Sequence, residues 1–259
     1  NKAPMYKEAS IQEQPDYTFT VSARGKSPSV PVFLFLRRQF GHLPLNRIES
    51  LFGFVERTTL YGGRSFGSRE FSARDVAQLN NAGIGVRLPL SNHYISREEY
   101  EENQGFLEKY NNKPNSVIVT NDDLARWVAE DFPNYRIDAS VIKNINNLKK
   151  LDKALELYDE VVLPMTANED TAFLSSIKTP ERITLFANAG CAFTCPSKTC
   201  YASFSKMNKG DKDAEFVCSQ SIKEREQLGM LDFELEPLID MGFRSFKLLR
   251  AAPGKMTGF

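Results

Sequence analysis

The sequence lacks several features that would place it in a common class of protein. Its 259 residues include only four cysteines, two histidines and one tryptophan, and 33 Lys and Arg balance 33 Asp and Glu. This net charge of zero argues against a domain held to nucleic acid mainly by charge, because phosphate binding needs an excess of Lys and Arg. The longest apolar run, 30–36, is about a third of the roughly 20 residues that a membrane-spanning helix requires. The first residues also lack the apolar core of a signal peptide. We therefore expect a cytoplasmic protein with no membrane span.

The motifs of common hydrolases are missing as well. The sequence contains no G-x-S-x-G, so no Ser-His-Asp arrangement can be assigned. It contains no HExxH and no paired histidines, which argues against catalysis by a histidine-bound zinc. Only Asp122 offers a carboxylate cleanly at a predicted strand end, whereas glycoside chemistry needs two.

Short β-rich runs alternate with helix-patterned stretches along most of the chain, which is typical of parallel strands joined by crossover helices. Eight strands and their intervening helices in about 220 residues predict a single TIM-like (β/α)8 barrel. We place this barrel at 30–259, with a cysteine-bearing loop at 188–218, and treat 1–29 as an N-terminal extension. Within that extension, 17–21 alternates apolar and polar residues, so it is either a further strand at the barrel floor, an arm on a partner or a partly ordered tail. The predicted strands are Val32–Arg37, Val55–Tyr61, Gly85–Leu90, Ser116–Thr120, Tyr135–Ala139, Glu160–Met165, Arg182–Ala187 and Arg244–Leu249.

Several helix boundaries are marked by capping residues. Ser72 precedes a helix that closes at Gly83, whose freedom to adopt a positive φ suits a left-handed C-cap. Ser96 with Glu99 forms a capping box. Asn121 begins the helix after the fourth predicted strand, and Asn46 is expected to precede a short apolar helix. The glycines at 62–67 follow a strand but lack the helix spacing of a nucleotide-binding turn, so a loop with positive φ angles is the simpler interpretation.

The active site of such a barrel lies at the mouth formed by the carboxyl ends of its strands. Polar residues that directly follow predicted strands are therefore the candidates. His93 can act as an acid, a base or a metal ligand, but an ordinary loop histidine with one hydrogen bond is the alternative. We predict catalytic roles for Tyr61, Asn92, His93 and Asn188. We predict substrate-binding roles for Asn121, Ser140, Lys247 and Arg250, the last two supplying positive charge for an anionic substrate or oxygen donor.

The cysteines give the strongest chemical signal. Cys191, Cys195, Cys200 and Cys218 all follow the seventh predicted strand, within 28 residues. Disulfides are disfavoured by the cytoplasmic assignment. Structural zinc sites usually carry two CxxC knuckles, whereas the spacing here is C-x3-C-x4-C-x17-C. Iron-sulfur clusters accept more varied spacing, and a proline beside a ligand cysteine is common in ferredoxins. The spacing favours an iron-sulfur cluster over zinc, and leaves zinc or unligated redox-active thiols open.

Taken in order, the motifs resemble the collagenase-like peptidase family, historically peptidase family U, number thirty-two. The resemblance extends over about residues 32–251. The matching segments are Tyr61–Phe66, Phe71-Ser72, Ala82–Ile84, GVRLPLSNH at 85–93, Ile137–Ser140 with Asn144, Glu160–Met165, Asn188–Tyr201 and Phe246–Arg250. The compact cysteine spacing indicates a divergent branch, and so does the sequence KLLRAAPG, which replaces the family's usual Lys-Ile-Glu-Gly-Arg after the last strand.

The resemblance implies a TIM-like barrel related to proteins for oxygen-independent hydroxylation of ubiquinone and of transfer and ribosomal RNA. Such proteins carry a 4Fe-4S cluster on four cysteines. Our main hypothesis is an iron-sulfur barrel enzyme that acts on a small anionic or aromatic molecule or on RNA, with a redox partner or a homologous subunit. If Cys218 is only a core residue, three ligands leave one iron free to bind substrate. The alternatives are a zinc-braced scaffold protein and a peptidase of the collagenase-like family.

Overall fold

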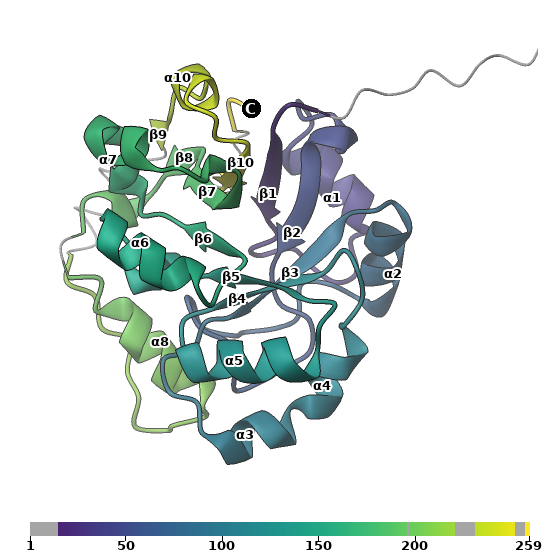
Figure 1. Ribbon diagram of the computed structural model, residues 1–259. Coiled ribbons are helices and arrows are strands. Elements are labelled where there is room, and N and C mark those ends of the chain that lie inside the picture. The colour runs from purple at the N-terminus through teal and green to yellow at the C-terminus, as the bar shows by residue number, and fades with distance from the viewer. Residues whose placement is uncertain (1–14, 196, 221–230, 252–256) are drawn as a thin grey trace, which may run out of the picture.

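The fold is a closed ring of eight parallel strands, in the order β1-β10-β7-β6-β5-β4-β3-β2. A computed structural model describes residues 15–195, 197–220, 231–251 and 257–259 of the chain. Helices surround the strands, as Figure 1 shows. The predicted single (β/α)8 barrel is confirmed. The barrel strands are β1 Thr18–Ser22, β2 Ile48–Phe52, β3 Gly85–Leu90, β4 Ser116–Val119, β5 Arg136–Ala139, β6 Glu160–Val162, β7 Ile183–Phe186 and β10 Ser245–Leu248.

Helices occupy the connections between successive strands. They are α1 Val32–Gln39, α2 Ala73–Asn81, α3 Arg97–Glu102, α4 Gln104–Lys109, α5 Asp122–Asp131, α6 Leu148–Leu155, α7 Thr171–Ser176, α8 Cys200–Asn208 and α10 Glu236–Asp240. Short 3-10 turns accompany them: η1 Leu45–Arg47, η2 Val141–Lys143, η3 Met165–Glu169, η4 Pro180–Arg182 and η5 Cys191–Phe193. A two-stranded antiparallel ribbon, β8 Asn188–Ala189 with β9 Leu231–Asp232, lies outside the ring.

The first two predicted strands are wrong, although the predicted number of barrel strands, eight, is right. The segment predicted as strand Val32–Arg37 forms helix α1 instead. Its buried residues Val32, Phe35 and Leu36 follow helical spacing, and Pro31 stands at the N-cap, where its missing N–H costs nothing. The segment Val55–Tyr61 is a loop, and β2 occupies the place where we expected a helix after Asn46.

The barrel starts earlier than the boundary at residue 30. Strand β1 pairs in parallel with β10 on one side and with β2 on the other, so it closes the ring. The prediction that 1–29 lies outside the barrel is therefore wrong for β1. Of the three interpretations of that alternating segment, the strand is the correct one, because pairing on both edges satisfies its backbone groups. Residues 1–14 of the predicted extension lie outside the described residues.

The caps predicted at Ser72, Gly83 and Asn121 are confirmed, whereas only half of the capping box predicted at Ser96 forms, because the Glu99 carboxylate binds Lys209 instead. Ser72 caps α2 with a full capping box, in which its side chain accepts from Asp75 N and the Asp75 carboxylate accepts from Ser72 N. Gly83 adopts φ +75° just after that helix. The Ser96 and Asn121 side chains accept from the backbone N–H groups of Glu99 and Leu124. These local signals position the loops that carry the candidate residues.

The strands separate an apolar outer layer from a polar barrel interior. On β3, for example, Val86 and Leu88 face the helices, whereas Arg87 points into the ring and binds Asp138 of β5 across the intervening β4. Side chains of strands that are not neighbours can meet in this way only inside the ring. TIM barrels usually fill this space with branched apolar residues. Here it holds buried charges. None of the described helices is long and apolar enough to cross a membrane.

Candidate functional site

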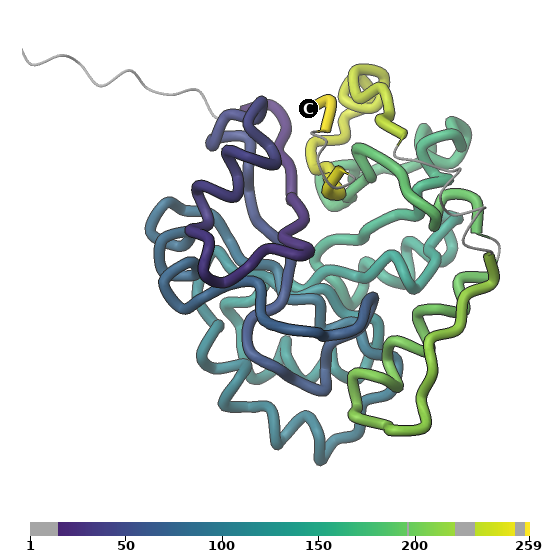
Figure 2. The backbone as a smooth tube through the Cα atoms, turned by 180° about the vertical axis from the view of Figure 1, so that it is seen from behind, coloured from purple at the N-terminus to yellow at the C-terminus, as the bar shows by residue number. Residues whose placement is uncertain are grey.

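The cysteine-bearing segment runs from the end of β7 to the loops of strands on the other side of the barrel mouth. It leaves the end of β7, forms η5 and then α8, and α8 docks on the loops that follow β2 and β3. Strand β3 lies opposite β7 in the ring. Figure 2 shows this segment in light green along one side of the molecule. The segment therefore belongs to the end of the barrel where active sites of this fold lie.

Polar contacts of α8 fix its position. The Asn208 side chain donates to Tyr61 O at 3.1 Å and to Arg64 O at 2.9 Å, and its oxygen accepts from Phe66 N at 2.8 Å. Ser205 is fully buried, and its hydroxyl contacts both the backbone N and the Nδ1 of His93, at 3.1 and 2.9 Å. These bonds satisfy polar groups of both α8 and the loops after β2 and β3, so they hold the helix against the barrel.

The four cysteines lie in or just after η5, at the start of α8 and in the residues that follow α8, and all are free thiols. Cys191 opens η5, and its carbonyl accepts from Cys195 N at 3.2 Å. Cys200 is the first residue of α8. The Ser203 hydroxyl donates to Cys200 O at 2.7 Å and accepts from Val217 N at 3.3 Å, which brings the residue before Cys218 to the start of α8. The start of α8 and the segment that leads to Cys218 thus lie side by side.

Electrostatic effects among the thiols agree with this convergence. Burial raises the pKa of the Cys200 thiol, and the charges of Cys191, Cys195 and Cys218 each raise it further. Burial would also raise the pKa of Cys195, but hydrogen bonds from Ser219 Oγ and from backbone N–H groups outweigh burial and lower it. Cys200 thus lies within electrostatic reach of the other three thiols, and four thiols are a donor set that suits soft metal ions and iron-sulfur clusters.

The donor chemistry fits a metal group, but the side chains do not form a finished site. Among the described residues, no three His, Cys, Asp or Glu side chains surround a common point at which a metal ion would be held. Metal binding would therefore require these side chains to rearrange. Pro196, the proline beside a ligand cysteine, lies outside the described residues.

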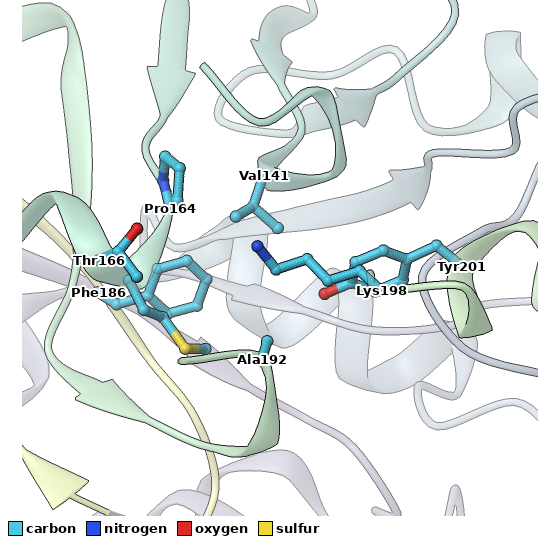
Figure 3. A pocket seen from close by; sticks show the side chains of 8 residues that line it. Val141, Pro164, Thr166, Phe186, Ala192, Lys198 and Tyr201 are labelled. Atoms are coloured by element: carbon cyan, nitrogen blue, oxygen red, sulfur yellow. The ribbon is translucent and has the colours of Figure 1, made fainter. Parts of the chain in front are cut away.

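A small pocket lies between the cysteine segment and the ends of β5, β6 and β7. Its walls include Phe186 and Met165 from the barrel and Ala192, Lys198 and Tyr201 from the cysteine segment. In Figure 3 the Lys198 amine extends toward Val141 and Thr166. Burial raises the pKa of the Tyr201 hydroxyl, and the thiols of Cys200, Cys191 and Cys195 raise it further. Sequence patterns did not indicate Lys198 or Tyr201, because neither residue directly follows a strand.

Two of the predicted catalytic residues are fully buried and hydrogen-bonded within the protein. The Tyr61 hydroxyl donates to Glu56 O at 2.7 Å and accepts from Val55 N at 3.0 Å. The Asn92 amide donates to Tyr61 O and to Ser205 O, while its oxygen accepts from Tyr94 N. In this arrangement both side chains shape the loops after β2 and β3.

His93 and Asn121 lie side by side at the mouth. The Asn121 amide donates to His93 O at 3.3 Å while its oxygen caps α5. Burial lowers the pKa of His93, which therefore favours the neutral imidazole. The hydroxyl beside its Nδ1 belongs to Ser205, which is closed to solvent, so the pair lacks the open nucleophile that a serine peptidase requires.

The remaining predicted residues occupy separate places. The Asn188 side chain bonds both backbone groups of Leu249, at 3.0 and 2.8 Å, and ties β8 to the end of β10. The Ser140 hydroxyl accepts from Ile142 N and caps η2. Arg250 donates to Gln39 at the end of α1 and to Arg24 O in the loop after β1. The substrate-binding roles of Lys247 and Arg250 stay predictions.

Lys247 points into the barrel interior. Its Nζ lies 4.4 Å from the ring centre of Phe52 on β2 and 5.6 Å from that of Phe186 on β7, although β10 is not a neighbour of β2. Burial, together with smaller effects of Arg87 and Arg64, lowers the pKa of Lys247 to about 7, and Asp138 opposes this shift. Its position in the last predicted strand made Lys247 a candidate. That its side chain lies inside the barrel becomes clear only from the structure, in which β1 and β10 close the ring.

Comparison with known proteins adds evidence at the level of the fold. No protein-family model and no curated protein matches the sequence. A solved structure described as that of the U32 peptidase Mk0906 superposes with a TM-score of 0.61 over 98% of each chain, at 13% sequence identity. The chain shares the fold of a U32 peptidase. The family resemblance predicted from the order of the motifs is thus supported in architecture. At this identity, the likeness to the U32 peptidase carries no statement about activity.

Proposed function

We propose that the protein is an iron-sulfur barrel protein, in which Cys191, Cys195, Cys200 and Cys218 hold a 4Fe-4S cluster at the mouth of the barrel. The observation that carries this proposal is that every cysteine of the chain lies on one segment as a free thiol. The charges of the other three cysteines raise the pKa of Cys200, which supports their proximity. A cluster of this kind supplies one-electron transfer when bound.

The surrounding residues support a reaction at the mouth rather than a remote structural brace. The pocket next to η5 is lined from one side by the cysteine segment and from the other by the barrel. Lys198, which follows Cys195 closely, extends its amine into this space and can bind an anionic group. Oxygen-independent hydroxylation, implied by the family resemblance, is the reaction class that we propose for this site.

The decisive measurement is iron and acid-labile sulfide per chain after purification without oxygen. We expect brown protein with four iron and four sulfide atoms, and broad visible absorption that is lost in Cys191→Ser and Cys200→Ser. Lys206→Ala on α8 is the matched control, because Lys206 lies exposed on the same helix. Its metal content should equal that of the unchanged protein.

The alternatives give different results in the same experiment. Colourless protein with stoichiometric zinc, lost in the same cysteine variants, would overturn the iron-sulfur proposal in favour of the zinc-braced scaffold. Cys218→Ser separates two forms of the main proposal. If the cluster keeps its iron in this variant, three cysteines suffice and one iron is open to substrate.

A further inference from the structure

A single buried hydroxyl on α8 contacts His93 at two atoms. Ser205 is 0% exposed, and its Oγ lies 3.1 Å from the backbone N of His93 and 2.9 Å from its Nδ1. A backbone N–H can only donate, so Oγ accepts the first of these hydrogen bonds. The direction of the second bond then depends on where the one proton of this hydroxyl goes.

The hydroxyl proton of Ser205 has one acceptor. Among the described residues, Nδ1 of His93 is the only acceptor atom within hydrogen-bond distance of this Oγ. Ser203 shows the more common arrangement, because its hydroxyl donates to Cys200 O three residues earlier on α8. The Ser205 hydroxyl makes no such bond to any described residue of its own helix. A buried hydroxyl proton without an acceptor is costly, so Ser205 donates to Nδ1.

This bond determines which ring nitrogen of His93 carries the proton. A neutral imidazole has one N–H and one unprotonated nitrogen, and only the unprotonated nitrogen can accept a hydrogen bond. Because Nδ1 accepts from Ser205, the proton of the neutral ring lies on Nε2. Burial lowers the pKa of His93, which favours this neutral form.

The Nε2 atom of His93 is available to a ligand. It has no hydrogen-bond partner among the described residues, and it is not one of the described buried side-chain atoms that lack a partner, so it reaches solvent. Asn121, the N-cap of α5, donates to His93 O and ties this residue to the next loop of the mouth. The ring thus presents an N–H donor at the end of the barrel where substrates of this fold bind.

From this geometry we propose that Ser205 is a positioning residue that holds His93 as the neutral tautomer with its proton on Nε2. His93 then serves at the mouth as a hydrogen-bond donor to an oxygen atom of a bound molecule, and neutral imidazoles polarise carbonyl groups in this way in other enzymes. It does not serve as a base, because Ser205 already binds its one lone pair. The donor role rests on the proposed function, which places the reaction at this mouth, whereas the proton assignment does not depend on a metal.

Nitrogen NMR of the full-length protein, labelled with 15N-histidine, reads the tautomer directly. The chain has only two histidines, and the exposed His42 is the internal control. At pH 8, above the ordinary histidine pKa of about 6.5, we expect His93 to carry its proton on Nε2 alone, whereas an exposed ring exchanges between both tautomers. A proton on Nδ1 of His93, or the same mixture as at His42, would overturn the proposal.

Two variants on α8 separate positioning from folding. Ser205→Ala removes the donor to Nδ1, and because a hydrogen bond of ordinary strength shifts an equilibrium by about fivefold, the excess of the Nε2–H tautomer should fall by about this factor. Ser203→Ala removes the hydroxyl that binds Cys200 O, so it disturbs the same helix but should leave His93 unchanged. Equal changes in both variants, or no change in folded Ser205→Ala, would contradict the role of Ser205.

Diethyl pyrocarbonate tests whether His93 can act as a base, because this reagent acylates only a ring nitrogen with a free lone pair. At pH 8 we expect His93 to react more slowly than His42, and Ser205→Ala to speed its reaction by about fivefold, measured by peptide mass spectrometry. Ser205→Thr keeps the hydroxyl and should react as slowly as the unchanged protein. Reaction of His93 as fast as that of His42 would overturn the donor role. Neither measurement involves iron, so failure of the iron-sulfur proposal would leave both results interpretable.

Discussion

Replacing Lys247 by methionine should stabilise the protein, which is unusual for a buried position. The surroundings lower the pKa of this lysine from 10.5 to about 7. One pKa unit corresponds to about 1.4 kcal/mol, so at pH 7 the folded state bears a cost of about 4 kcal/mol relative to an exposed lysine. Methionine keeps most of the length and the contact with Phe52 and Phe186 without the charge. We expect Lys247→Met to raise the free energy of unfolding by up to about 4 kcal/mol at pH 7.

The pH dependence makes this prediction specific. Between pH 7 and 10.5 the unfolded chain binds more protons at this lysine than the folded chain, so the stability of the unchanged protein rises with pH in that window. The advantage of Lys247→Met should therefore shrink to about 2 kcal/mol at pH 9. Urea unfolding of both proteins at several pH values measures the difference, and the titration of other groups cancels between them.

The same substitution at Lys26 provides the control. Lys26→Met would leave the Asp75 carboxylate buried without its partner, so we expect a loss of about 3–5 kcal/mol. The two substitutions would change the free energy of unfolding in opposite directions, because Lys26 is paired with a carboxylate and Lys247 is not. The reasoning fails if Lys247→Met is less stable than the unchanged protein at pH 7, or if the difference between them does not change with pH.

Three further substitutions test other parts of the structure. Asp138→Asn should cost about 3–5 kcal/mol in urea unfolding, because it removes the nearest carboxylate partner of the buried Arg87; full stability would show that this ion pair does not stabilise the barrel. Ser205→Ala should cost about 1–3 kcal/mol and expose α8 to limited proteolysis; an unchanged cleavage pattern would show that this hydroxyl does not hold the helix. Gly62→Ala should destabilise by more than about 1 kcal/mol, since the new Cβ would lie 2.3 Å from Ser91 C; a neutral result in thermal unfolding would disprove that close approach.

The sequence predicts most of this barrel because its signals are local. Ser72, Ser96 and Asn121 mark helix starts through side chains that bond within the next turn. The barrel strands from β3 onward were predicted close to their observed bounds, since each is a short β-rich run between caps and turns, whereas β8 and β9 were not predicted. Segment 32–37 was misassigned because an apolar run of this length suits a buried strand and a helix equally well. Strand β1 could not be separated from a tail, because its evidence is pairing with β10, over 200 residues away.

The site is predictable in composition but not in geometry. The sequence alone shows that the four cysteines lie on one segment, and the fold places the residue before Cys218 beside the start of α8. What spacing could not show is that the buried Ser205, more than 100 residues from His93 in the sequence, contacts the backbone N and the Nδ1 of that histidine. Nor could it show that Tyr61 and Asn92 satisfy backbone groups in the loops below α8. Polar residues at strand ends are candidates for catalysis and for loop structure alike, and only long-range contacts distinguish them.

Phe186 contacts both of the unusual chemical features of this barrel. It lines the pocket that the cysteine segment covers at the mouth, and its ring centre lies 5.6 Å from Nζ of the buried Lys247. Phe186→Ala should therefore make this amine easier to reach from the mouth, and faster modification of Lys247 by a small amine-reactive reagent, located by mass spectrometry, would demonstrate it. Unchanged modification would place the route to Lys247 elsewhere.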